Sequence, residues 1–252
     1  MSYRRIEVLP DKAAIVARSL ELVSDRIQQA IATNGRCTLA LAGGSTPKPL
    51  YEALSQCEVD WAKLHVFWGD ERYVPVDHPD SNEGMARQAW LNHVAIPAEN
   101  IHPMPTTMAD PAIAAQAYHQ DIQTFFQIEP GMVPTLDIVL LGMGDDGHTA
   151  SLFPHTPALS VGDRLVTVGD KNGEPRLTLT IPLLNQAHCV LFLVAGANKQ
   201  DALQQVLATG AAGEQVDPNN VPARYIQPQG ELWWLLDQAA DGGNNYHQLN
   251  KN

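Results

Sequence analysis

Short apolar runs rich in branched and aromatic residues, each followed by a glycine-rich or polar turn, recur along this chain of 252 residues. The clearest lie at residues 37–42, 63–68, 136–141, 189–194 and 231–236. A continuous apolar run of about six residues is typical of a strand buried on both faces, as in a parallel sheet. This feature therefore favours folds in which helices cover both faces of a sheet.

Segments with helical spacing of apolar residues alternate with these runs. They lie at residues 11–32, 47–54, 81–91, 111–126 and 200–207, and Asp11 is suited to cap the first of them, which Gly35 follows. The alternation predicts an α/β fold with a doubly wound, mostly parallel sheet and helices on both faces.

The remaining segments complete this prediction. Residues 164–168 and 176–181 resemble further strands, and 96–110 and 210–222 are expected to be loops. No change of composition marks a domain boundary, so we expect one α/β domain at residues 1–240. The residues 241–252 are polar and are expected to form a disordered tail.

The net charge and the cysteine content limit which binding partners and which cellular compartment are expected for this chain. The formal net charge is −12 and the sixteen basic residues do not cluster, which argues against a nucleic-acid binder. The longest apolar stretch, residues 189–195, is far shorter than the roughly 20 residues of a membrane-spanning helix, and the start lacks a signal-peptide pattern. Cys37, Cys57 and Cys189 have neither paired nor metal-ligand spacing, as expected of free thiols in a reducing cytoplasm.

The segment at residues 142–154, Gly-Met-Gly-Asp-Asp-Gly-His-Thr-Ala-Ser-Leu-Phe-Pro, directly follows one of the apolar runs. Ligands of parallel sheets gather at the carboxyl ends of strands, which is where His148 would lie. A lone histidine usually bonds a backbone carbonyl, but here Gly147 permits a sharp turn and Asp146 is near enough to orient the ring and raise its basicity. His148 is therefore a candidate general base, with Asp146 as its partner.

The same glycines allow a rival interpretation. Residues 142–147 match Gly-x-Gly-x-x-Gly, and Asp170 lies near the distance at which a dinucleotide-binding protein places its ribose-binding acid. Two features weaken this reading. The aspartates of the loop would repel a pyrophosphate, and Pro154 and Pro157 leave little room for the helix that should follow.

A second loop, Gly43-Gly44-Ser45-Thr46, leaves a strand and precedes a helix, which is an arrangement that binds phosphate through backbone N–H groups. Lys48 adds a further donor. A tight turn in which Ser45 or Thr46 caps the helix explains the segment equally well. The loop lacks the Gly-Lys-Ser/Thr ending of a nucleotide-binding P-loop, so an ATPase is not favoured.

Charged residues stand beside other apolar runs. Asp70, Arg72, Arg176 and Lys199 are the candidates. Each alone is typical of a structural or surface charge. Together, Arg72, Arg176 and Lys199 would supply one cleft with the local positive charge that an anionic ligand needs in an acidic protein.

Several reaction classes lack their motifs. There is no Gly-x-Ser-x-Gly, so a serine hydrolase is not favoured, and no His-Glu-x-x-His or Cys/His cluster, so no metal site is expected. What remains is a histidine base, aspartates and a phosphate-binding loop. A histidine that activates water against a carbonyl needs no covalent intermediate.

These residues resemble the glucosamine-6-phosphate isomerase/6-phosphogluconolactonase family, and specifically its lactonases. The matching segments run in family order through nearly the whole chain, and they are residues 41–47, 67–75, 81–82, 141–154, 176–180, 196–199 and 222–224. The resemblance implies the fold of glucosamine-6-phosphate deaminases and ribose-5-phosphate isomerases. It also implies a hydrolase of 6-phospho-D-glucono-1,5-lactone that uses neither metal nor cofactor.

The resemblance also implies roles by position. His148 would deprotonate the attacking water, and Asp146 would orient or polarise its ring. Backbone N–H groups of the 43–46 loop would bind the substrate or the developing oxyanion, and Asp70 would bond a sugar hydroxyl. The phosphate would be held by the three cations, Arg72, Arg176 and Lys199.

Two other functions stay open at this point. A phosphosugar isomerase or deaminase would use the same phosphate-binding loop but needs a carboxylate base for proton transfer at carbon. A non-catalytic sensor of sugar phosphates would not need the pair of His148 and Asp146. For the lactonase, the expected partner is the phosphosugar lactone, with no nucleic acid and no membrane, and the chain is expected to act as a cytoplasmic monomer.

Overall fold

The computed structural model describes residues 3–251, and six parallel strands form its main sheet. Their order is β1 (Tyr3–Leu9), β9 (Glu231–Asp237), β8 (Cys189–Val194), β5 (Ile138–Leu141), β2 (Cys37–Leu41) and β3 (Leu64–Trp68). The central strands β2, β5 and β8 are buried along their whole length. The predicted doubly wound, mostly parallel α/β fold is confirmed.

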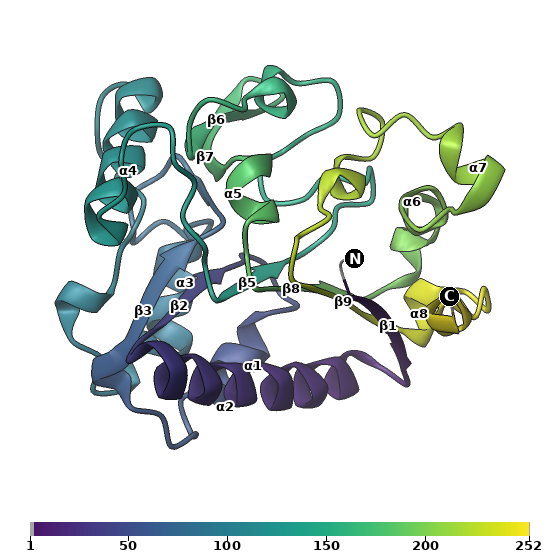
Figure 1. Cartoon of the computed structure of the whole chain (residues 1–252), viewed down its shortest axis with the longest axis horizontal. Helices are drawn as coiled ribbons and strands as arrows, with labels where there is room; N and C mark the ends of the chain where they lie inside the picture. The colour runs from purple at the N-terminus through teal and green to yellow at the C-terminus, as the bar shows by residue number, and fades with distance from the viewer. Residues whose placement is uncertain (1–2, 252) are drawn as a thin grey trace.

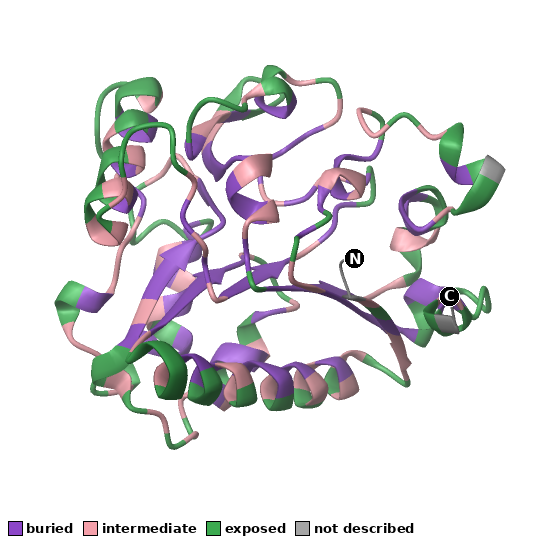
Figure 2. Ribbon diagram, viewed as in Figure 1, coloured by how far each residue is buried: buried purple, intermediate pink, exposed green. Residues whose placement is uncertain are grey.

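Helices lie on both faces of this sheet. Figure 1 shows α1 (Lys12–Asn34) and α2 (Lys48–Leu54) below it and α5 (Ile181–Asn185) above it. The predicted cap is present, since the Asp11 carboxylate accepts the N–H of Ala14 at 2.9 Å, and Gly35 ends α1 with a φ of 74°. In Figure 2 the buried residues follow the sheet and the side of α1 that faces it.

The other helices are short or flank the sheet. They are α3 (Asn82–Ala89), α4 (Pro111–Phe126), α6 (Gln200–Val206), α7 (Gly210–Glu214) and α8 (Gln238–Asp241). Single 3₁₀ turns are η1 (Trp61–Lys63), η2 (Leu91–His93), η3 (Ala98–Asn100), η4 (Pro157–Ser160), η5 (Ala197–Lys199) and η6 (Pro222–Tyr225). The expectation that 210–222 is only a loop is wrong, because α7 lies within it. The guanidinium of Arg224 donates to the carbonyls of Ala208 and Gly213, which holds this segment in place.

A second, antiparallel sheet stands apart from the main one. It contains β4 (Asp70–Arg72), β7 (Glu174–Leu179) and β6 (Val166–Lys171), in that order. β6 and β7 correspond to the two strand-like segments expected near 164–168 and 176–181. They form a hairpin because Asn172 and Gly173 both adopt positive φ, 57° and 88°, which is the geometry of a tight two-residue turn.

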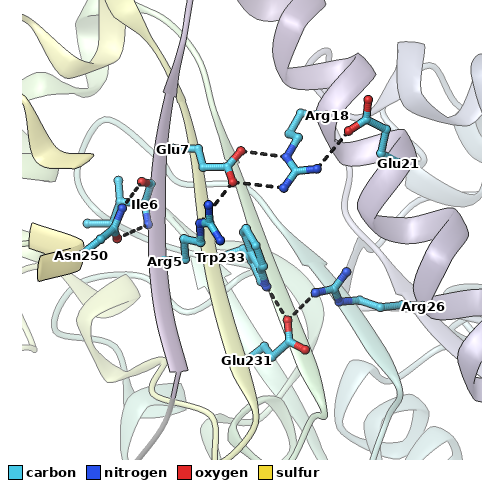
Figure 3. Close-up of polar contacts among 9 residues, drawn as sticks. All are labelled: Arg5, Ile6, Glu7, Arg18, Glu21, Arg26, Glu231, Trp233 and Asn250. Carbon is cyan, nitrogen blue, oxygen red and sulfur yellow. Dashed lines mark hydrogen bonds and ion pairs between the residues drawn. The ribbon is translucent and has the colours of Figure 1, made fainter. Parts of the chain in front are cut away.

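The sequence patterns missed β1, and they were wrong about disorder in the tail. β1 lies at the edge of the sheet and contains Arg4, Arg5 and Glu7, so it lacks the continuous apolar run by which the other strands were predicted. Asn250 of η7 (Tyr246–Lys251) closes that edge by accepting the N–H of Ile6 at 2.7 Å and donating to its carbonyl at 2.6 Å (Figure 3). The carboxylate of Asp241 accepts the N–H of Tyr246, which is buried. These tertiary bonds order a segment whose composition alone looks disordered.

On the face of the sheet that packs against α1, charged side chains of β1 and β9 form ion pairs with arginines of α1 (Figure 3). The guanidiniums of Arg5, Arg18 and Arg26 lie 5.2 to 5.6 Å from the ring of Trp233. Glu7 pairs with Arg5 and Arg18, and Glu231 pairs with Arg26 and accepts the indole N–H. Each of these three arginines therefore has a carboxylate partner.

The three cysteines are free thiols, and Cys37 and Cys189 are buried. Within residues 3–251, no helix combines the length and the hydropathy needed to cross a membrane.

Candidate active site

One pocket, of about 260 Å³, lies at the carboxyl ends of β2, β3 and β5. Loops that follow these three strands form its floor, and the antiparallel sheet and the start of α6 supply further lining residues. The predicted site residues that line it are Gly43, Asp70, Arg72, His148, Arg176 and Lys199. The predicted residues absent from its lining are Gly44, Ser45, Thr46 and Asp146. Sequence reasoning assigned no role to two polar lining residues, Asn82 and Lys171.

Asp146 fixes the position of His148 through two contacts with one carboxylate oxygen. Nδ1 of the ring lies 2.6 Å from Oδ1 of Asp146, and the backbone N–H of His148 donates to the same oxygen at 3.0 Å. Partial burial opposes ionisation of Asp146, but these hydrogen bonds outweigh it and lower its pKa to about 2. Because a carboxylate only accepts, Nδ1 carries the proton and Nε2 of the neutral ring is left as a proton acceptor.

The glycines of this loop make room for the pair. A Cβ at Gly144 would lie 2.1 Å from Nδ1 of His148 and 2.5 Å from Oδ1 of Asp146, so a side chain there would displace both. Gly147 adopts a φ of 78°, and its carbonyl accepts the N–H of Ala223 at 2.9 Å, which ties the loop to η6. No helix occurs within residues 142–154, so the dinucleotide interpretation of these glycines does not fit.

Phe153 lies between His148 and the cationic wall of the pocket, which is formed by Arg72, Arg176, Lys171 and Lys199. Its ring centroid lies 4.4 Å from that of His148 and 5.6 Å from the guanidinium carbon of Arg176. Ala150, which also lines the pocket, adopts a φ of 47°, a left-handed conformation that is rare for alanine. The turn after His148 is therefore strained where it borders the pocket.

Two arginines lie side by side because β4 and β7 pair in register, with Arg72 opposite Arg176. Burial, and next the charge of Arg72, lower the pKa of Arg176, although nearby carboxylates oppose this. Arg72 donates to the carbonyl of Asp80 at 2.7 Å, and its buried Nε has no hydrogen-bond partner among residues 3–251. Two adjacent guanidiniums with an unused donor are suited to an oxyanion such as phosphate.

Two lysines extend this cationic wall. Lys199 ends η5, and Lys171 ends β6 just before the hairpin turn. Asn172-Gly173 between two strand-like segments is a sequence signal for a tight hairpin. That signal, had it been used, would have placed Lys171 on the same sheet as Arg176.

Glu71 fastens β4 to the start of α3. It is 2% exposed, and its carboxylate accepts the N–H groups of Arg72 and Asn82 at 2.8 Å and of Glu83 at 2.7 Å. The hydroxyl of Ser81 lies 3.3 Å from the same carboxylate. Burial raises the pKa of Glu71 to about 7, while the N–H donors oppose that rise. Glu71 thereby fixes Arg72 and Asn82 beside each other in the pocket wall.

Asn82 and Gly43 meet at close range. The Asn82 amide donates to the carbonyl of Asp70 at 2.8 Å, and a Cβ at Gly43 would lie 1.8 Å from its Oδ1. A glycine is therefore needed at position 43 to allow the close approach of the 43–46 loop to the start of α3. The N–H groups of Gly43, Gly44 and Ser45 bond to nothing within the described residues 3–251, so they are free to donate to a ligand.

Asp70 lies in the pocket wall and is itself hydrogen-bonded. It is 7% exposed, and its Oδ2 accepts the hydroxyl of Ser151 at 2.6 Å. This contact links the start of β4 to the His148 loop. In the described part of the chain, no group of three or more His, Cys, Asp and Glu side chains is placed to share a metal ion.

The fold and the pocket define an α/β enzyme whose site is suited to an anionic substrate, because a histidine–carboxylate pair faces two adjacent arginines at the strand ends. Comparison with known proteins identifies the family. Residues 10–234 match the family described as glucosamine-6-phosphate isomerases/6-phosphogluconolactonase, and the chain belongs to this family of enzymes.

Its relatives agree with this assignment. A protein of Synechocystis sp. named 6-phosphogluconolactonase is 61% identical, over 94% of this chain and 96% of its own length. A Mycobacterium tuberculosis protein of the same name is 39% identical, over 93% of this chain and 96% of its own length.

Solved structures agree on the fold. The 6-phosphogluconolactonase of Trypanosoma brucei is 30% identical with a TM-score of 0.84, covering 96% of this chain and 99% of its own. A monomeric glucosamine-6-phosphate deaminase, 19% identical with a TM-score of 0.77 over 94% of this chain and 99% of its own, shares the fold.

Proposed function

We propose that this chain hydrolyses 6-phospho-D-glucono-1,5-lactone to 6-phospho-D-gluconate, in the oxidative pentose phosphate pathway, with His148 as the general base. The name carried by its relatives supports the reaction. The mechanism rests on one observation: the His148–Asp146 pair, 2.6 Å apart, presents its ring to the pocket lined by Arg72 and Arg176.

The proposed reaction needs no covalent intermediate. Nε2 of His148 takes a proton from water as the water oxygen attacks the lactone carbonyl, and Asp146 stabilises the imidazolium that forms. The resulting oxyanion accepts hydrogen bonds from the free N–H groups of Gly43, Gly44 and Ser45, while Thr46 of the same loop contributes to substrate binding. As the ring C–O bond breaks, His148 returns its proton to the departing ring oxygen.

The phosphate lies in this proposal against Arg72, Arg176 and Lys199, with Lys171 as a fourth cation. Two guanidiniums side by side match the oxygens of a phosphate, and a bound dianion offsets the repulsion between their charges. Asp70 accepts a sugar hydroxyl with the oxygen that does not bond Ser151. The phosphate anchor thereby positions the carbonyl for the histidine.

The test is lactone hydrolysis by the wild type and His148→Ala, with substrate made in situ and spontaneous hydrolysis subtracted. General-base catalysis contributes about 10²- to 10⁴-fold, so His148→Ala should lose at least about 10²-fold in kcat. Equal rates would exclude His148 as the base. If neither protein exceeds the spontaneous rate while glucosamine 6-phosphate is deaminated, the isomerase-like alternative replaces the lactonase. Tight sugar-phosphate binding without any turnover would instead indicate a sensor.

We also propose that the chain acts in the cytoplasm as a monomer, with the phosphosugar lactone as its partner and no nucleic acid or membrane. The net charge of −12 supports the absence of nucleic acid. Light scattering after size exclusion tests the monomer, which at 27.5 kDa is easily distinguished from a dimer.

A further inference from the structure

A second pocket lies on the main sheet at the end formed by β1 and β9, and it shares no lining residue with the active site. It has a volume of about 310 Å³. Apolar side chains from β9, α6 and η6 with its neighbours line it, together with two arginines. Its lining includes Arg4, Leu207, Arg224, Ile226, Leu232 and Trp234.

Arg4 is the unusual feature of this pocket. On β1, Arg5 and Glu7 point toward α1, whereas Arg4 points to the opposite face, beside its register partner Leu232. Its side chain is half-buried and has no hydrogen-bond or ion-pair partner among residues 3–251, although the chain carries twelve more acidic than basic residues. A cation left without a carboxylate in an acidic protein indicates a place for an external anion.

Arg224 adds a second charge that no carboxylate neutralises. Nη1 and Nη2 of its guanidinium donate to four carbonyls, those of Gln205, Val206, Ala208 and Gly213, and none of these partners carries a charge. Burial, and then the charge of Arg224, lower the pKa of Arg4. The active site shows the same electrostatic pattern, since Arg72 acts on Arg176 in the same way.

The lining determines what kind of anion fits. Both terminal nitrogens of Arg224 donate to carbonyls of the chain, whereas Arg4 makes no such bond among residues 3–251, and the fork of one guanidinium matches the two oxygens of one carboxylate. Trp234, Leu232, Ile226 and Leu207 line the pocket beside Arg4, so the part of a ligand beyond its carboxylate lies next to apolar side chains. We propose that this pocket binds a small aromatic or cyclic monocarboxylate, with its carboxylate on Arg4 and its ring against Trp234.

Two connections run from this pocket toward the active site. α6 begins beside Lys199 and ends at Val206 in the second pocket, and Ala223 of its lining bonds the carbonyl of Gly147, next to His148. The pocket is nevertheless separate in its residues. Binding there is therefore measurable without a substrate and independently of the proposed lactonase reaction.

The test uses 2-naphthoate as the probe and 2-naphthamide, its neutral analogue, by isothermal titration calorimetry. A charge-assisted hydrogen bond contributes enough for roughly a tenfold or larger change in affinity. We expect saturable binding of 2-naphthoate, at least tenfold weaker binding of 2-naphthamide, and at least a tenfold loss in Arg4→Gln. The matched control is Arg5→Gln, the same change one residue away on the other face, which should bind 2-naphthoate within about twofold of the wild type.

A second measurement locates the probe. In ¹H–¹⁵N spectra, the indole signal of Trp234, identified by its loss in Trp234→Phe, should shift on titration with 2-naphthoate in the wild type and not in Arg4→Gln. Arg72→Gln should leave this shift unchanged, because Arg72 lies in the other pocket. No binding, equal affinity for both probes, equal loss in Arg4→Gln and Arg5→Gln, or loss of the Trp234 shift in Arg72→Gln would each overturn the proposal.

Discussion

Replacing Gly144 by alanine should remove activity without unfolding the protein. The added Cβ would lie 2.1 Å from Nδ1 and 2.3 Å from Cε1 of His148, and 2.5 Å from Oδ1 of Asp146. Ordinary contacts of a Cβ begin near 3.4 Å, so the ring must retreat by roughly 1 Å or more. The side chain of His148 is 22% exposed and has room to move outward.

The size of the effect follows from this displacement. A misplacement of about 1 Å in a catalytic group costs about 10²-fold in rate, which corresponds to about 2.7 kcal/mol in activation free energy. Complete loss of the base would cost up to about 10⁴-fold. We therefore expect kcat of Gly144→Ala to fall by about 10²-fold or more, toward the level of His148→Ala, while its unfolding free energy changes by less than about 1 kcal/mol.

The assay is lactone hydrolysis corrected for the spontaneous rate, with urea unfolding of each variant measured in parallel. The control is Gly162→Ala, the same substitution in an exposed loop where an added Cβ has nothing within 4 Å. It should keep wild-type kcat. If Gly144→Ala keeps more than half of the wild-type kcat, the inferred placement of His148 is incorrect.

Three further predictions follow from buried or paired groups. Because burial raises the pKa of Glu71 from 4.5 to about 7, its contribution to stability is full below pH 4.5 and is lost as the pH rises through 7. Over this range, the unfolding free energy of the wild type, measured with urea, should fall by up to about 3 kcal/mol relative to that of Glu71→Gln. Parallel pH profiles of the two proteins would contradict this prediction. Arg176→Gln should raise KM at least tenfold with less change in kcat, and steady-state kinetics showing an unchanged KM would remove its phosphate contact. Asn250→Ala should lower the unfolding free energy by about 1–3 kcal/mol because Ile6 loses two hydrogen-bond partners, whereas His247→Ala, an exposed neighbour, should change it by less than about 0.5 kcal/mol.

The site was only partly visible in the sequence. His148 and Asp146 are two residues apart, so a local turn was enough to predict that they meet, and the structure joins them at 2.6 Å. Arg72 and Arg176 were expected to share one cleft, but the sequence did not predict that they lie directly opposite each other. Their adjacency depends on the register between β4 and β7, which no local pattern specifies.

Asn82 and Lys171 show why the remaining site residues were missed. Asn82 reaches the pocket because the buried carboxylate of Glu71 binds the start of α3, a contact between residues 11 apart in the chain. Lys171 reaches it because a hairpin turns at Asn172 and Gly173. Neither residue carries chemistry in its immediate sequence that distinguishes it from a surface polar residue.

The sequence by itself determined the α/β class, the cap at Asp11 and the loop that carries His148. It also located five strands to within a residue or two, those at 37–42, 63–68, 136–141, 189–194 and 231–236. These features were predictable because apolar periodicity, capping and glycine turns depend on only a few neighbouring residues. Only the tertiary structure decided that the 164–181 region forms a separate antiparallel sheet, that β1 and the final turn close the sheet edge, and that four cations meet at one pocket. These features depend on pairing between segments far apart in the chain. Such pairing is chosen by the packing of the whole molecule rather than by local propensity.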